Sequence, residues 1–160
     1  MKVRFLFYKA AIDGKILDNA ISSWTGLFPC NWGTKGYSHV EFEAEGRCFS
    51  STTRGGARGV RFAPSKEVLK HPERWDYVEY DAPEERLRRT LRHMSKLVGL
   101  KYDYNGILGF FLPWNTESKD KWYCSEICAL VAYELKLIPY HKRISPRRLS
   151  KIMGGAKPLQ

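Results

Sequence analysis

Alternation of apolar and polar residues is the feature of this sequence that most restricts its fold, and it is concentrated before residue 81. An alternating segment places every second side chain on one face, as in a strand that covers a core. Such segments occupy residues 2–8, 37–43 and 75–80. The turn signal Glu45-Gly46 predicts a hairpin between residues 37–43 and a partner strand at residues 48–52.

Helical spacing dominates the second half of the chain. Asp81 is predicted to cap a helix whose buried stripe includes Leu87, Leu91, Met94 and Val98. A second helix is predicted from Cys124 onward. A third begins at a Ser145 cap and turns Leu149 and Ile152 inward. A shorter helix is also predicted within residues 16–24, followed by a loop at residues 27–36.

The length and charge of the chain limit its class. Its 160 residues suit one domain, residues 1–160, and 43% hydrophobic residues favour a folded core. The net charge of +10 favours an anionic partner such as nucleic acid, anionic lipid or an acidic wall polymer. The opening residues have too short an apolar stretch for a signal peptide, and no segment is apolar for the length of a membrane span. A cytoplasmic protein with free thiols is therefore expected.

Cys124 is the candidate nucleophile among the four cysteines, which also include Cys30, Cys48 and Cys128. It stands at the first turn of a predicted helix, where unpaired N–H groups and the helix dipole favour a thiolate. A backbone N–H at the same turn could stabilise an oxyanion. Cys128, one turn further on, is interpreted as a core residue. The alternative for Cys124 is the same, because buried free cysteines are common small hydrophobic residues.

His39 is the candidate base. Glu41 lies two residues further along the same predicted strand, so both side chains project to one side and the carboxylate could orient the imidazole. The alternative is a solvent-exposed strand face. Cys124, Cys128 and His39 could instead bind a metal, but a fourth ligand is missing, so no metal or other cofactor is expected.

Two stretches together resemble the circularly permuted branch of the papain-like superfamily, which includes NlpC-type peptidases and lecithin retinol acyltransferase relatives. The histidine half is Tyr-Ser-His-Val-Glu-Phe at residues 37–42, followed by Gly-Val-Arg-Phe at residues 59–62. The cysteine half is Tyr-Asp at residues 102–103 and Trp-Tyr-Cys-Ser-Glu at residues 122–126. The histidine segment precedes the cysteine segment, as in the permuted branch, and small phage-encoded members look especially similar.

The resemblance implies an α+β papain-like fold, with an antiparallel sheet or partial barrel packed against the helix that starts at Cys124. It makes Cys124 the nucleophile and His39 the base, with Tyr102 as a hydrogen-bonding partner near the thiolate. In many relatives a third polar residue comes from the next strand. The residues available there are Ser50, Ser51 and Thr52, and Glu41 could substitute for them.

The expected activity is that of a thiol hydrolase or acyltransferase that works through an acyl-enzyme in a bacterial or phage-infected cell. Amide bonds of peptidoglycan peptides, other peptides or isopeptides are the first choice of substrate. Lipid esters or amides are the second, because the aromatic segment at residues 107–114 could line an apolar pocket. A different class is a non-catalytic module that binds nucleic acid or a host partner through its basic surface.

Overall fold

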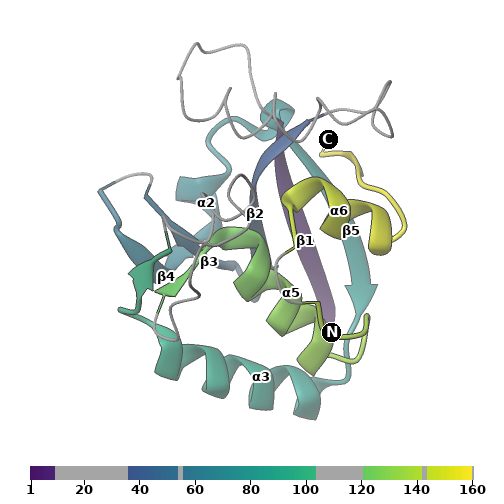
Figure 1. The fold of residues 1–160 in the computed structure, drawn as a ribbon. Helices are drawn as coiled ribbons and strands as arrows, with labels where there is room; N and C mark the ends of the chain where they lie inside the picture. Colours follow the sequence, from purple (N-terminus) through teal and green to yellow (C-terminus); the bar gives the residue numbers. More distant parts are fainter. Residues whose placement is uncertain (10–35, 54–55, 104–120, 142–143, 160) are drawn as a thin grey trace, which may run out of the picture.

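The computed structural model describes residues 1–9, 36–53, 56–103, 121–141 and 144–159, which form an α+β structure with a mainly antiparallel open sheet (Figure 1). The strands are β1 (Lys2–Lys9), β2 (Tyr37–Ala44), β3 (Arg47–Thr52), β4 (Gly59–Pro64), β5 (Trp75–Asp81), β6 (Lys101–Tyr102), β7 (Lys121–Trp122) and β8 (Lys157–Pro158). The helices are α2 (Ser65–Val68), η2 (Pro72–Arg74, a 3₁₀ turn), α3 (Glu84–Leu97), α5 (Cys124–Glu134) and α6 (Pro146–Ile152). The order across the sheet is β7-β6-β4-β3-β2-β1-β5-β8, and β6 and β7 are parallel. The helix predicted within residues 16–24, the loop at 27–36 and the aromatic segment at 107–114 lie outside the described residues.

The alternation before residue 81 produces the predicted strands. Strand β1 lies between β2 and β5, and its residues Val3, Phe5 and Phe7 are buried in the main core. Leu6 points to the opposite face and is also buried. The β2–β3 hairpin turns at Glu45 and Gly46, whose φ values of 52° and 73° suit a tight two-residue turn between twisted strands.

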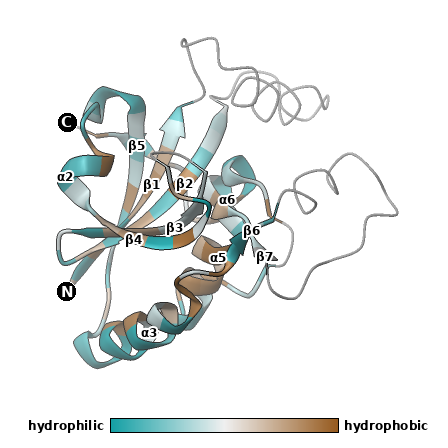
Figure 2. Ribbon diagram, turned by 90° about the vertical axis from the view of Figure 1, so that its left-hand side faces the viewer, coloured by the Kyte–Doolittle hydropathy of each residue, from teal (hydrophilic) through white to brown (hydrophobic). Residues whose placement is uncertain are grey.

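Helices α5 and α6 cover one face of the sheet, and α3 packs against α5 (Figure 1). Helix α5 is buried around most of its circumference, because it lies between the sheet and α3. Hydrophilic and hydrophobic residues alternate along α3, which keeps its charged side in solvent (Figure 2). None of the helices in the described part of the chain is long and apolar enough to span a membrane.

Three predictions about helix ends are wrong. Asp81 does not cap α3, because it pairs with Lys2 in the sheet and remains extended; Pro83 precedes the helix instead. Val98 lies just beyond the last turn and is 45% exposed. Ile152 is 36% exposed, and the next residue, Met153, is buried in its place. The predicted Ser145 cap is confirmed: its hydroxyl accepts a hydrogen bond from the N–H of Arg148.

The second face of the sheet also carries a buried cluster. Leu6, Cys48 and Trp75 form its centre, and Val68 and Leu69 pack against them from α2 and the residue that follows it. The alternative interpretation of β2, in which the face that carries His39 is exposed to solvent, is wrong for this reason. The covering segments α2 and η2 are too short to show a periodic pattern in the sequence.

The sheet opens between β2 and β3 at the end where β2 begins. Among the described residues, the β2–β3 ladder involves residues 42–44 of β2, whereas the β1–β2 ladder continues to Tyr37. The start of α5 binds at this opening. Ser51 donates its hydroxyl to the Trp122 carbonyl at 2.6 Å, and the Cys128 thiol lies 3.7 Å from the Val40 carbonyl oxygen. The opening allows a residue on the helix side of the sheet to reach a side chain on the other side.

Gly59 fixes the edge of the sheet that leads toward α5. A Cβ at this position would lie 2.0 Å from the carbonyl oxygen of Leu100. Only glycine therefore allows β4 to approach the chain entering β6. Because β6 pairs with β7, this close approach helps to place Lys121 and Trp122, which lead into the turn at Cys124.

Candidate active site

Cys124 is the first residue of α5, as predicted. Tyr123 before it is extended, with φ −104° and ψ 164°, and its carbonyl accepts the first helical hydrogen bond from Ile127. Ser125 anchors the turn by donating its hydroxyl to the Ile144 carbonyl at 2.5 Å. The first N–H groups of a helix have no acceptor within the helix, so they can stabilise negative charge at Cys124.

The structure brings His39 and Cys124 together across the opening in the sheet. The imidazole and the thiol lie close enough for each to shift the pKa of the other, and both residues are only 4% exposed. Nε2 of His39 lies 2.8 Å from Oε1 of Glu41. Since Glu41 occupies Nε2, Nδ1 is the ring nitrogen left to hydrogen-bond the thiol.

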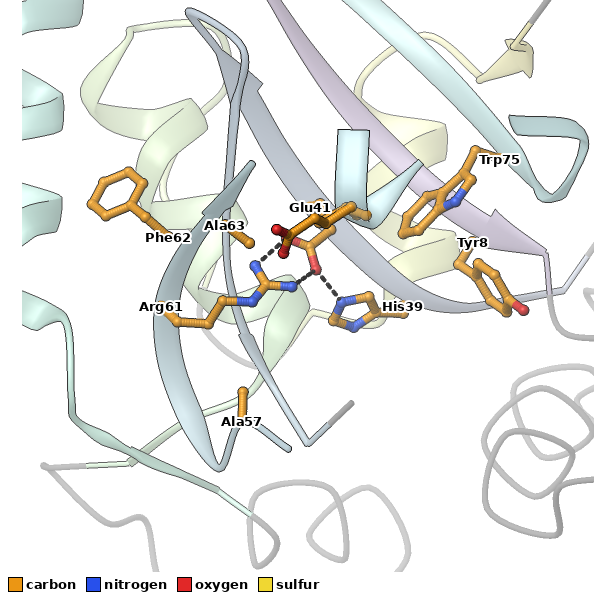
Figure 3. A pocket seen from close by; sticks show the side chains of 10 residues that line it. Tyr8, His39, Glu41, Ala57, Arg61, Phe62, Ala63 and Trp75 are labelled. Carbon is orange, nitrogen blue, oxygen red and sulfur yellow. Dashed lines mark hydrogen bonds and ion pairs between the residues drawn. The ribbon is translucent and has the colours of Figure 1, made fainter. Parts of the chain in front are cut away.

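Glu41 binds two cationic partners at once. Its carboxylate contacts His39 through Oε1 and receives both terminal nitrogens of Arg61, each at 2.7 Å (Figure 3). Glu41 is 1% exposed, so these contacts replace its hydration. The carboxylate predicted to orient the imidazole therefore does lie against it.

The pKa values of these groups favour the charged forms. Burial lowers the pKa of His39, but the hydrogen bonds and charges of Cys124 and Glu41 outweigh this effect and raise it to about 9. Burial raises the pKa of Glu41, but hydrogen bonds and charges from His39 and Arg61 bring it below its usual value. The carboxylate is consequently ionised beside an imidazolium at neutral pH.

The pKa of the Cys124 thiol is also shifted toward the charged form. Burial raises the pKa of Cys124, but the charge and hydrogen bond of His39 lower it, helped by backbone hydrogen bonds to Val40 and Ser125. A backbone group that lowers the pKa of a thiol does so by donating its N–H to the thiolate. These effects favour a thiolate–imidazolium pair that is oriented by a carboxylate, an arrangement suited to nucleophilic catalysis.

A pocket of about 480 Å³ opens beside the imidazole. His39, Glu41 and Arg61 form its polar wall, and Tyr8 and Trp75 form an aromatic wall (Figure 3). The rings of His39 and Trp75 meet edge to face, with centroids 6.4 Å apart. Cys124 does not belong to the lining of this pocket.

The polar residues on β3 have other contacts. Ser50 donates its hydroxyl to the Val40 carbonyl at 2.8 Å, and Ser51 donates to the Trp122 carbonyl at 2.6 Å. Thr52 is buried at the end of the strand. Tyr102 lies opposite Trp122 in the β6–β7 ladder, near the segment that enters α5. The two serines thus bind backbone carbonyls around the Cys124 turn, whereas Glu41 contacts the imidazole.

Arg61 and Trp75 were not recognised as site residues from the sequence. Trp75 lies in a predicted strand and Arg61 in the segment at residues 59–62. Each can be placed on the same sheet face as His39 only once the strand pairing is known. A further signal was the Gly-Val-Arg-Phe segment itself, in which a lone arginine alternates with apolar residues.

The described residues contain no group of three or more potential metal ligands. Comparisons of the chain with protein-family models, with curated proteins and with solved structures gave no significant match. The function proposed below therefore depends on the geometry of the site and on the motif resemblance.

Proposed function

We propose that the chain is a thiol hydrolase or acyltransferase with a permuted papain-like fold, in which Cys124 is the nucleophile, His39 the base and Glu41 the orienting carboxylate. The observation that carries this proposal is the series Cys124–His39–Glu41, in which the carboxylate hydrogen-bonds the imidazole and the imidazole lowers the pKa of the thiol although the thiol is buried. A structural cysteine buried in an apolar core has its pKa raised instead.

The chemistry follows from the contacts. The Cys124 thiolate attacks a carbonyl carbon, and backbone N–H groups at the start of α5 hold the oxyanion. The imidazolium of His39 gives its proton to the leaving amine as the C–N bond breaks, which leaves a thioester on Cys124. Water, or another nucleophile in an acyltransferase, then loses a proton to neutral His39 as it attacks the thioester. The acid or transfer product leaves, and the thiolate–imidazolium pair is restored.

Amide bonds of peptides, isopeptides or peptidoglycan peptides are the substrates we favour. An imidazolium already present in the resting site supplies the proton that an amine leaving group needs, whereas an ester's leaving group needs it less. The pocket beside His39 offers apolar walls for a side chain or acyl group close to the reacting centre. Lipid esters or amides are the second substrate class, and a comparison of short peptide amides with fatty acyl esters separates the two.

The test is acylation by an activated ester such as p-nitrophenyl butyrate. We expect a burst of about one p-nitrophenolate per protein, and a butyryl mass increase on the peptide that contains Cys124. The Cys124→Ala variant should lose the burst, whereas Cys128→Ala, which removes a buried thiol on the same helix, should keep it. Acylation distributed among the cysteines, or absent from Cys124, would overturn the proposal and favour a binding module that uses the basic surface.

A further inference from the structure

Arg61 reaches Glu41 from a strand that is not its neighbour. In the ladder between β3 and β4 it pairs with Ser50, and Glu41 lies one strand further away on β2. The guanidinium contacts the carboxylate end on, with Nη1 to Oε2 and Nη2 to Oε1 both at 2.7 Å (Figure 3). Such a two-point contact fixes the plane of the carboxylate as well as its position.

The four side chains of the site alternate in charge. Thiolate, imidazolium, carboxylate and guanidinium follow one another in contact, and their formal charges sum to zero. Three of them are almost completely buried, and the Arg61 side chain is 21% exposed. Without the guanidinium, the buried series carries an excess negative charge that protonation of Glu41 or Cys124 would relieve.

We propose that Arg61 is a positioning residue whose guanidinium holds the Glu41 carboxylate ionised and oriented against the imidazole of His39, and thereby maintains the nucleophilic form of Cys124. This inference rests on the proposed function for the roles of His39 and Cys124. Arg61 itself acts through Glu41 and touches no reacting atom in this scheme. Lysine cannot replace it fully, because one ammonium group cannot form the two parallel contacts.

A second arginine–glutamate pair on the same sheet provides a matched control. Arg4 on β1 binds Glu43 on β2 at 2.6 Å, and Glu43 is buried like Glu41. The Arg4 side chain is 34% exposed, and its glutamate partner lies two residues beyond Glu41 on the same strand face. Removal of Arg4 therefore costs a comparable ion pair without removing a contact of Glu41.

Other titratable groups surround the Arg61–Glu41 pair. Cys48 faces it from β3 and Cys128 from α5, and burial raises the pKa of both thiols, so they are neutral at pH 7. Tyr8 from β1 and Glu67 from α2 line the adjoining pocket. Glu67 is exposed.

The test measures the pH dependence of Cys124 alkylation by iodoacetamide, with each cysteine peptide quantified by mass spectrometry. In Arg61→Met we expect the midpoint to move up by at least one pH unit, so that alkylation at a pH well below the wild-type midpoint falls roughly tenfold. Arg61→Lys, which retains a charge and so protects folding, should show an intermediate shift. Arg4→Met should keep the original midpoint even if its melting temperature falls.

Two further measurements separate positioning from a general structural role. In a Glu41→Gln background, Arg61→Met should shift the midpoint much less than it does alone, because the two residues act through one contact. Ethylguanidinium should partly restore the profile of Arg61→Ala, since the arginine side chain borders the pocket. A wild-type midpoint already in the range of ordinary thiols overturns the proposed function, and the role of Arg61 with it. A low wild-type midpoint that Arg61→Met and Arg61→Lys leave unchanged overturns the role of Arg61 alone.

Discussion

Cys124 and Cys128 lie one turn apart on α5 and are both buried, yet their pKa values move in opposite directions. Burial raises the pKa of the Cys128 thiol well above its ordinary value, and the negative charges of Glu41 and Cys124 add to the increase. Burial acts on Cys124 in the same sense, but the imidazole and two backbone N–H groups reverse the result. Burial is therefore not what distinguishes the two thiols.

Val40 contributes to the environment of both cysteines. Its backbone N–H helps to lower the pKa of the Cys124 thiol, and its carbonyl oxygen accepts from the Cys128 thiol at 3.7 Å. A second carbonyl, that of Phe49, lies 3.9 Å from the Cys128 sulfur. Donors favour a thiolate and acceptors favour a thiol. One residue of β2, placed at the opening of the sheet, thus helps to set opposite protonation states on successive turns of α5.

The strongest way to break this contrast is to remove the imidazole. In His39→Gln, the amide keeps a polar side chain but cannot become a cation, so Cys124 should lose most of its thiolate. A thiol with a pKa of about 8.5 is only about 0.3% ionised at pH 6, so alkylation of Cys124 at that pH should fall by about 100-fold.

Peptide-level alkylation rates from pH 5 to 9 measure the effect of His39→Gln, and Cys128 provides the internal control. The slow rate of Cys128 should not change. An alkylation profile of Cys124 that is the same with and without the imidazole would show that the helix start alone lowers its pKa, and that His39 is not its partner.

Removal of the Cys128 thiol should leave the pH dependence of Cys124 alkylation unchanged. Cys128→Ala removes a buried sulfur that contacts two carbonyls, and we expect a loss of about 1–2 kcal/mol in the free energy of unfolding. The alkylation rate of Cys124 should stay within about twofold of wild type at every pH. Urea denaturation measures the first effect. A shift of the Cys124 midpoint by a full pH unit would instead show that the two thiols titrate as a coupled pair.

The sequence predicts those parts of the contrast between Cys124 and Cys128 that depend on the spacing of residues within one strand or one helix. Alternation placed His39 and Glu41 on one face of β2, and helical spacing placed Cys124 at the start of α5 with Cys128 inside it. These relations involve residues two to four positions apart, which backbone geometry fixes. Their relative positions within each element are accordingly as predicted.

The contacts between elements could not be predicted in the same way. Arg61 meets Glu41 only through the register of β2, β3 and β4, and Cys124 meets His39 only because β2 and β3 separate. Both relations depend on long-range strand pairing. The misplacement of Val98 and Ile152 has a different cause, since a helical pattern does not show at which residue the last turn ends.

The smallest effect concerns stability as a function of pH. The folded pKa of His39, about 9, is above its unfolded value of about 6.5, so its stabilisation is complete below pH 6.5 and is lost as the pH rises toward 9. The folded pKa of Cys124 is lowered, so its stabilisation is present above the unfolded pKa of about 8.5 and is lost as the pH falls through the folded value. Between about pH 6.5 and 8.5 the two slopes oppose each other.

We therefore expect the thiolate–imidazolium pair to contribute a plateau of stability between about pH 6.5 and 8.5, and a decline below it of about 1 kcal/mol per pH unit. Below pH 6.5 the unfolded chain carries a proton on both groups, whereas the folded pair holds only one until the pH falls through the folded pKa of Cys124. Urea denaturation of wild type and of His39→Gln/Cys124→Ala from pH 5 to 9 isolates this contribution, because Glu41 and the other carboxylates are present in both. Between pH 5 and 8.5, the difference in unfolding free energy between wild type and the double variant should change with pH only below pH 6.5. A difference that stays constant down to pH 5 would mean that Cys124 is a neutral thiol in the folded protein, as Cys128 is, and that the contrast between the two turns of α5 does not exist.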